Sequence, residues 1–274
     1  MQSLLREGHT GSSMPFFFLR TNRDERGCGI VAALRAGIAC LLLGLNMNIE
    51  AAENFEARRA AMVAEIEDMM RETRRDTGRA ALSDRVTNAL LKVERHRFVP
   101  ESQVGHAYYN RPLSIGHGQT ISQPYIVALM TDLLDVGPGD KVLEVGTGSG
   151  YQAAVLAEIV RAVYSIEIVE PLGREAARAL AAAGYRNVHT RIGDGYAGWP
   201  EEAPFDAIIV TAAAPNVPQP LIDQLKAGGR LVIPVGAQYD AQSLYVVTKD
   251  ARGAISRRKA LDVRFVPLTR KPIN

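Results

Sequence analysis

From residue 141 onward, the chain alternates short apolar runs with longer stretches in which apolar residues recur every three or four positions. The short runs predict buried strands, and the longer stretches predict amphipathic helices. We therefore expect strands at residues 141–145, 163–168, 187–191, 206–211, 229–235 and 243–248. We expect helices at residues 152–159, 170–183 and 218–227. This alternation predicts the α/β class, with a doubly wound and mostly parallel sheet.

The part of the chain that precedes this alternation is predicted to be largely helical. Met62 and Ile66 recur at helical spacing, with charged residues between them, in a helix that ends before Gly78. Further elements are a helix that starts near Ser83 or Asp84, an irregular segment at residues 97–122 and a helix at residues 125–134. The sheet is therefore expected to carry an N-terminal helical extension.

The first part of the chain has a different character. Residues 29–45 are apolar apart from Arg35, and they follow a stretch that is rich in arginine. This resembles a signal peptide, but the run is short and interrupted by charge for a membrane span. Three interpretations stay open: a translated extension upstream of the true start, an export signal, or a loosely membrane-associated helix. We expect residues 1–54 to be an extension of a domain at residues 55–274.

The composition excludes several classes of binding partner and of catalytic site. Lys and Arg total 32 against 30 Asp and Glu, too small an excess for the clustered basic face that nucleic-acid binding needs. Both cysteines, Cys28 and Cys40, precede the domain, so its body has no thiol nucleophile or disulfide. No two histidines have the spacing of a paired metal site. We expect a cytoplasmic protein with no nucleic-acid partner, no metal and no membrane attachment, and export or membrane association through residues 29–45 is the alternative.

The most informative segment is VLEVGTGSGYQ at residues 142–152, an apolar strand that runs into three alternating glycines. Gly146, Gly148 and Gly150 permit a sharp turn and let a ligand lie against the main chain. A dinucleotide-binding loop needs Gly or Ala at position 151, and Tyr151 stands there. A nicotinamide-dependent dehydrogenase is therefore disfavoured. What remains, an acidic residue followed by G-x-G-x-G, resembles motif I of the S-adenosylmethionine-dependent methyltransferases.

Three acidic residues are predicted at the carboxyl ends of successive strands, where open α/β sheets bind their ligands. Glu144 precedes the glycine loop, and Glu167 lies 21 residues after Gly146, where an acidic side chain accepts hydrogen bonds from ribose hydroxyls. Asp194 follows the third strand, in reach of an adenine amino group. The expected residues of an S-adenosylmethionine site are Glu144, Gly146, Thr147, Gly148, Glu167 and Asp194.

A second polar cluster, GQTISQP at residues 118–124, lies where a helix is predicted to begin. Thr120 and Ser122 offer hydroxyl groups, and the helix N-terminus adds N–H groups and the positive end of a dipole. Together these suit an anion such as a carboxylate. The alternative is that Ser122 only caps the helix. A serine hydrolase is not indicated, because neither Ser122 nor Ser149 lies in G-x-S-x-G.

The chain from about Ala57 to Arg270 resembles the protein-L-isoaspartate O-methyltransferases. The resemblance is carried by ERHRFVP at residues 94–100, GQTISQP at 118–124, VLEVGTGSGYQ at 142–152, FDAIIVTAA at 205–213, the segment 225–236 and VRFVPL at 263–268. It implies a methyl transfer from S-adenosylmethionine to the α-carboxylate of L-isoaspartyl residues in damaged proteins, which starts their repair. It also implies that Ser122 is the active-site serine and that Thr120, Ser122 and Gln123 bind the substrate.

Two other functions stay open on the sequence alone. The first is a methyltransferase of the same class that acts on another acceptor, with Ser122 serving only as a helix cap. The second is a protein that binds S-adenosylmethionine or a nucleoside without catalysis.

Overall fold

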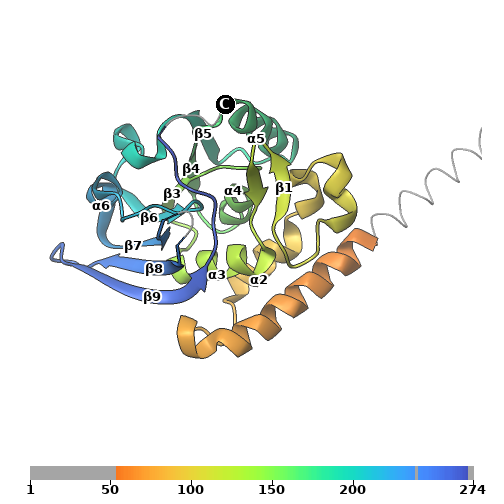
Figure 1. Ribbon diagram of the computed structural model, residues 1–274, viewed down its shortest axis with the longest axis horizontal. Coiled ribbons are helices and arrows are strands. Elements are labelled where there is room, and N and C mark those ends of the chain that lie inside the picture. Colours follow the sequence, from red (N-terminus) through yellow and green to blue (C-terminus); the bar gives the residue numbers. More distant parts are fainter. Residues whose placement is uncertain (1–53, 238–239, 271–274) are drawn as a thin grey trace, which may run out of the picture. The chain divides into compact units, whose positions relative to one another are not determined.

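The computed structural model describes residues 54–237 and 240–270, so the predictions for residues 29–45 and for both cysteines lie outside the described residues. Its main feature is a seven-stranded sheet in the order β5-β4-β3-β6-β7-β8-β9 (Figure 1). The strands are β3 (Lys141–Val145), β4 (Ala162–Glu167), β5 (Val188–Ile192), β6 (Phe205–Val210), β7 (Leu225–Val235), β8 (Gln242–Lys249) and β9 (Ile255–Val263). The strands from β5 to β7 are parallel, and β8 and β9 are antiparallel. The predicted doubly wound, mostly parallel sheet is confirmed.

Helices cover both faces of the sheet (Figure 1). They are a long helix at residues 54–77, α2 (Asp84–Lys92), α3 (Pro124–Leu134), α4 (Tyr151–Ala157), α5 (Glu170–Ala182) and α6 (Gln219–Gln224). The described residues also form the short 3₁₀ helices η1 (Arg95–Phe98), η2 (Glu101–His106), η3 (Gly195–Ala197) and η4 (Pro200–Glu202). None of the helices in the described residues combines the length and apolar character needed to cross a bilayer.

The near-continuous apolar strands are explained by burial on both sides, because successive side chains of a strand point to opposite faces. Val142 and Ile209 pack in the core that includes the long helix and α2 to α5. Leu143 and Ile208 pack in the second core, under α6. A strand with only one buried face would alternate apolar and polar residues, which these strands do not do.

The structure departs from the sequence prediction in the C-terminal part and in the segment 97–122. Strand β7 begins at Leu225, so α6 is shorter than the helix expected at 218–227. Strand β9 was not predicted, because it is an edge strand whose residues are mostly exposed and therefore show no apolar pattern. The segment 97–122 contains η2 and a hairpin of β1 (Leu113–Gly116) and β2 (Gln119–Ile121).

The order of the strands locates the place where a ligand can bind. The chain runs from β3 outward through β4 and β5, and then returns to β6 on the other side of β3. The connections after β3 and β6 therefore leave the sheet in opposite directions, and a crevice opens at their carboxyl ends. The glycine loop at residues 146–150 follows β3, and Thr211 follows β6.

Candidate functional site

The glycine loop has a backbone that side chains would obstruct. Gly146, Gly148 and Gly150 have φ angles of 99°, 54° and 90°, a region that glycine adopts with little strain. A Cβ built on Gly146 would lie 2.4 Å from Thr211 Oγ1, so this glycine also permits a close approach to the residue after β6. Thr211 Oγ1 donates a hydrogen bond to the Gly146 carbonyl over 2.6 Å. The two strand ends are thus fastened together at the crevice.

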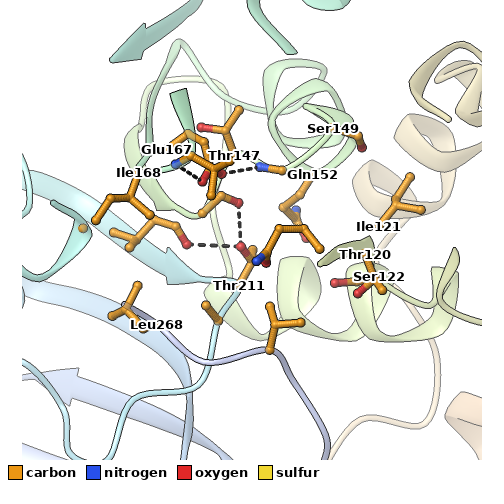
Figure 2. Close-up of a pocket in the computed structure, with 18 of the residues that line it drawn as sticks. Thr120, Ile121, Ser122, Thr147, Ser149, Gln152, Glu167, Ile168, Thr211 and Leu268 are labelled. Carbon is orange, nitrogen blue, oxygen red and sulfur yellow. Dashed lines mark hydrogen bonds between the residues drawn. The ribbon is translucent and has the colours of Figure 1, made fainter. Parts of the chain in front are cut away.

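Glu167 supports the same loop from the end of β4. Its side chain is 7% exposed, and its two carboxylate oxygens accept hydrogen bonds from Gly148 N and Val169 N, each over 2.9 Å. A carboxylate has about four lone-pair positions, so each oxygen can accept one more bond. Glu167 lines the pocket over the glycine loop, as a ribose-binding residue would (Figure 2).

Glu144 lies in a different position from the one the sequence suggested. It is fully buried, it is absent from the lining of the pocket, and Ser165 Oγ donates to its Oε2 over 2.5 Å. Thr147 Oγ1 lies 2.6 Å from Ser165 Oγ, so a chain of polar groups connects Glu144 to the glycine loop. Glu144 is therefore placed to support the loop from beneath, whereas Thr147 lines the pocket itself.

Burial is the main cause that raises the pKa of Glu144 from 4.5 to about 8. The hydrogen bond from Ser165 opposes this shift, and the charge of Glu167 contributes to it. Between pH 4.5 and about pH 8 the folded protein retains a proton on Glu144 that the unfolded chain releases. The free energy of unfolding therefore falls as the pH rises through this range. A neutral side chain of the same shape would not have this dependence.

We expect Glu144→Gln to be more stable than the parent protein at pH 8, by roughly 5 °C or more in melting temperature. The difference should shrink towards pH 5, because the carboxyl group of the unfolded chain then approaches its own pKa and also retains its proton. Thermal unfolding followed by circular dichroism at pH 5, 6.5 and 8 measures it. Two parallel curves of melting temperature against pH would contradict the assignment of the buried proton to Glu144.

Asp194 lies directly before Gly195, which lines the pocket. The side chain of Asp194 caps η3, since it accepts a hydrogen bond from Tyr196 N over 2.9 Å. Gly195 lines the pocket, whereas Asp194 is partly exposed next to it and is not part of the lining. The structure thus places Asp194 beside the cavity over the glycine loop.

Ser122 lies between the hairpin and α3. His117 and Gly118 turn the hairpin with φ angles of 51° and 67°, and Ser122 follows β2 directly. The N-cap of α3 is Gln123, without a side-chain capping bond, so the hypothesis that Ser122 caps this helix is wrong. Instead the Tyr125 N–H of the first turn is bound by the side chain of Asn110, over 3.0 Å.

The hydroxyl group of Ser122 is available for a ligand. It makes no hydrogen bond to any residue in the described ranges 54–237 and 240–270, and the residue is only partly buried. The Ser122 carbonyl, in contrast, accepts a hydrogen bond from Arg95 Nη2 over 2.8 Å. Arg95 therefore fixes the backbone of Ser122, whereas the Ser122 hydroxyl can bind a ligand.

Two pockets meet at Ser122. The first lies over the glycine loop and Glu167. The second is a cavity of about 600 Å³ whose walls include Met69 and Thr73 of the long helix. The residues that line both pockets are Thr120, Ser122, Thr211 and Val266. Gln123 lines only the second pocket, and Figure 2 shows Thr120, Ser122 and Thr211 around the first.

The C-terminal segment forms part of this common wall. Ala213 N donates to the Val266 carbonyl and Leu268 N donates to the Ala213 carbonyl, each over 2.8 Å. These bonds lay the segment 263–269 across the carboxyl end of β6, so that it lines both pockets. The sequence predicts no position for this segment, because its partners are more than 50 residues away.

Thr211 is the site residue that the sequence reasoning missed. It ends an apolar strand, binds the Gly146 carbonyl and lines both pockets. Its signal in the sequence was a polar residue at the carboxyl end of a predicted strand, next to the switch point. Within the described part of the chain, no group of three or more His, Cys, Asp or Glu side chains could hold a metal ion.

The chain is similar to proteins of known family along most of its length. The family model described as protein-L-isoaspartate(D-aspartate) O-methyltransferase matches residues 64–272. Protein-L-isoaspartate O-methyltransferase 2 of Polaromonas sp. is 63% identical over 208 residues, which are 76% of this chain and 99% of that protein. Protein-L-isoaspartate O-methyltransferase 1 of Cupriavidus necator is 58% identical over 235 residues, 85% of this chain and 91% of that protein.

Solved structures agree with these relatives. A protein-L-isoaspartate O-methyltransferase structure matches with a TM-score of 0.66 and 29% identity, over 75% of this chain and 65% of that one. A Plasmodium falciparum structure described as a protein of this kind, in complex with S-adenosyl-L-homocysteine, matches with a TM-score of 0.61 and 29% identity. The match covers 75% of this chain and 98% of that one.

Proposed function

Because the chain belongs to the protein-L-isoaspartate(D-aspartate) O-methyltransferase family, we propose that its two adjoining pockets hold the methyl donor and the methyl acceptor of that reaction. The protein is an S-adenosylmethionine-dependent enzyme that methylates isoaspartyl residues in proteins and so takes part in their repair. The donor is placed over the glycine loop and the acceptor beside Ser122. The observation that carries this assignment is the wall of four residues that both pockets share.

The residues of the first pocket fit the donor. Gly146 and Gly148 line this pocket and carry no side chain, so a ligand can lie directly against the main chain of the loop. In this proposal Glu167 accepts hydrogen bonds from the ribose hydroxyls, and the lone pairs that the backbone does not use support this role. In this proposal Asp194, which lies beside the lining, accepts a hydrogen bond from the adenine amino group. S-adenosylmethionine supplies a methyl group that its sulfonium already activates.

The residues of the second pocket fit an isoaspartyl carboxylate. This group is ionised at neutral pH, so the enzyme needs no general base to activate it. Ser122 donates a hydrogen bond to one of its oxygens, with Thr120 and Gln123 beside it. The task of these residues is alignment, since the attacking oxygen must lie about 3–3.5 Å from the methyl carbon and in line with the bond that breaks. The α-carboxylate is the acceptor group in this assignment.

We expect methyl transfer to a peptide with one L-isoaspartyl residue to exceed transfer to its normal aspartyl twin at least about 100-fold. The reason is that the side-chain carboxylate of the normal aspartyl residue would be displaced from near-attack geometry. Transfer of radiolabelled methyl groups to the two peptides measures this. Equal rates would indicate a methyltransferase with another acceptor. Binding of S-adenosylmethionine without turnover on either peptide would indicate a non-catalytic binding protein.

We propose that the methyltransferase domain covers residues 55–274 and that residues 1–54 are an extension. The match of the family model to residues 64–272 supports these limits. The cytoplasmic location and the absence of nucleic-acid, metal and membrane partners stay predictions of the sequence.

A further inference from the structure

Arg95 is a fully buried arginine that binds the backbone of Ser122, a residue of both pockets. It is 0% exposed and is the first residue of η1. Its Nε donates to the Ala107 carbonyl over 2.8 Å, and its Nη2 donates to the Ser122 carbonyl over 2.8 Å. The guanidinium carbon lies 4.7 Å from the centre of the Tyr151 ring. The side chain therefore contacts three segments that are distant in the sequence.

The position is a costly one for a charged group. Burial lowers the pKa of Arg95 to about 10, so the guanidinium still carries its charge at neutral pH. Within the described residues its polar contacts are two backbone carbonyls, and no carboxylate forms an ion pair with it. A buried charge without a counter-ion destabilises the folded state, whereas an apolar side chain of this volume would pack at no such cost. Packing alone does not explain an arginine here.

The three contacts connect the two halves of the site. Ala107 follows η2, in the segment that leads to the hairpin. Ser122 lines both pockets, and Tyr151 begins α4 directly after the glycine loop and lines the first pocket. A guanidinium group can bind two carbonyls in fixed directions while its flat face lies on an aromatic ring. This combination fixes the backbone of Ser122 relative to the loop.

We propose that Arg95 is a positioning residue, which holds Ser122 at the place where the acceptor carboxylate must meet the methyl donor. It acts through the Ser122 backbone and touches neither substrate. The inference rests on the proposed role of the Ser122 hydroxyl in the reaction. It also explains why Tyr151 follows the glycine loop, since a Gly or Ala at this position would leave the guanidinium without its ring.

Arg95→Lys keeps the positive charge. It removes the planar guanidinium group, which binds two carbonyls at once and contacts the Tyr151 ring. We expect kcat for an isoaspartyl peptide to fall about 10-fold or more, because a small misplacement of an aligning group has a large effect on rate. The dissociation constant of S-adenosylmethionine, measured by calorimetry, should change less than about 3-fold, since the donor contacts of the loop remain. Leu90→Ala is the control, because Leu90 is buried in the same core but lines neither pocket; it should lower the melting temperature without lowering kcat.

A double-mutant cycle with Ser122→Ala separates this inference from the function on which it rests. If Arg95 acts through the Ser122 hydroxyl, Arg95→Lys should change kcat much less in the Ser122→Ala background than in the parent enzyme. Equal fold-changes in both backgrounds would overturn the role of Arg95 while leaving that of Ser122 intact. Full activity of Ser122→Ala alone would overturn both. If Arg95→Lys fails to fold, the neutral Arg95→Gln takes its place in the same cycle.

Discussion

Ser122→Ala should lower kcat for methyl transfer about 100-fold or more, while the affinity for S-adenosylmethionine stays nearly unchanged. Among the residues that the structure describes, the fold uses the carbonyl oxygen of Ser122 but not its hydroxyl oxygen. The carbonyl is bound by Arg95, and the hydroxyl makes no hydrogen bond to the described residues. Its removal therefore leaves the loop, the helix and the donor contacts in place, but the acceptor carboxylate loses the group that orients it.

The measurement is steady-state methylation of an isoaspartyl peptide, together with calorimetric titration of S-adenosylmethionine. Ser114→Ala is a matched control, because Ser114 is an exposed serine in the same hairpin, opposite Thr120, and lines neither pocket. It should keep the parental rate. Equal losses of rate and of cofactor affinity in Ser122→Ala would show that Ser122 supports the donor pocket and does not align the acceptor.

Glu167→Gln should weaken the binding of S-adenosylmethionine about 10-fold to 30-fold, because a charged acceptor of hydrogen bonds is replaced by a neutral one. Glu167→Ala should weaken it further and also lower the melting temperature. The reason is that alanine leaves Gly148 N and Val169 N without their acceptors, so the loop loses its support along with the ligand contact. Glutamine keeps one of these two bonds.

A pair of ligands tests whether Glu167 binds the ribose. The parent enzyme should bind S-adenosylhomocysteine more tightly than its 2′-deoxy analogue, and in Glu167→Gln this preference should shrink. Glu170→Gln is the control, since Glu170 is exposed three residues later and lines neither pocket. An unchanged dissociation constant, or an undiminished preference for the hydroxyl, would refute the ribose assignment.

The sequence was most informative about elements whose pattern arises from their own burial. Strands β3 and β6 are buried on both faces and read as continuous apolar runs, so they were located within a residue. Strand β9 was missed, because an edge strand with exposed residues has no apolar pattern to detect. The hairpin before Ser122 was read as irregular for a related reason. Its strands are only 4 and 3 residues long, too short for a period to emerge.

The position of Glu144 in the motif does not fix the direction of its side chain. The acidic residue before the glycine loop was expected to contact the cofactor, yet its side chain lies beneath the loop and accepts a hydrogen bond from Ser165. Position in a motif does not say which side of a strand a residue faces, since successive residues of a strand point in opposite directions. For Glu167, at the end of the neighbouring strand, the side chain faces the pocket.

The fold class, the donor and the family can be predicted from the sequence, because each is expressed in residues that are near one another in the chain. The glycine loop and the segment GQTISQP are local patterns, and their chemistry follows from residue type and spacing. The way in which the donor and acceptor sites meet depends on the tertiary structure. Ser122, Thr211 and Val266 come from three separate segments, and Arg95 is brought to Ser122 and Tyr151 by packing of distant elements. Such contacts depend on the fold as a whole, and no local pattern encodes them.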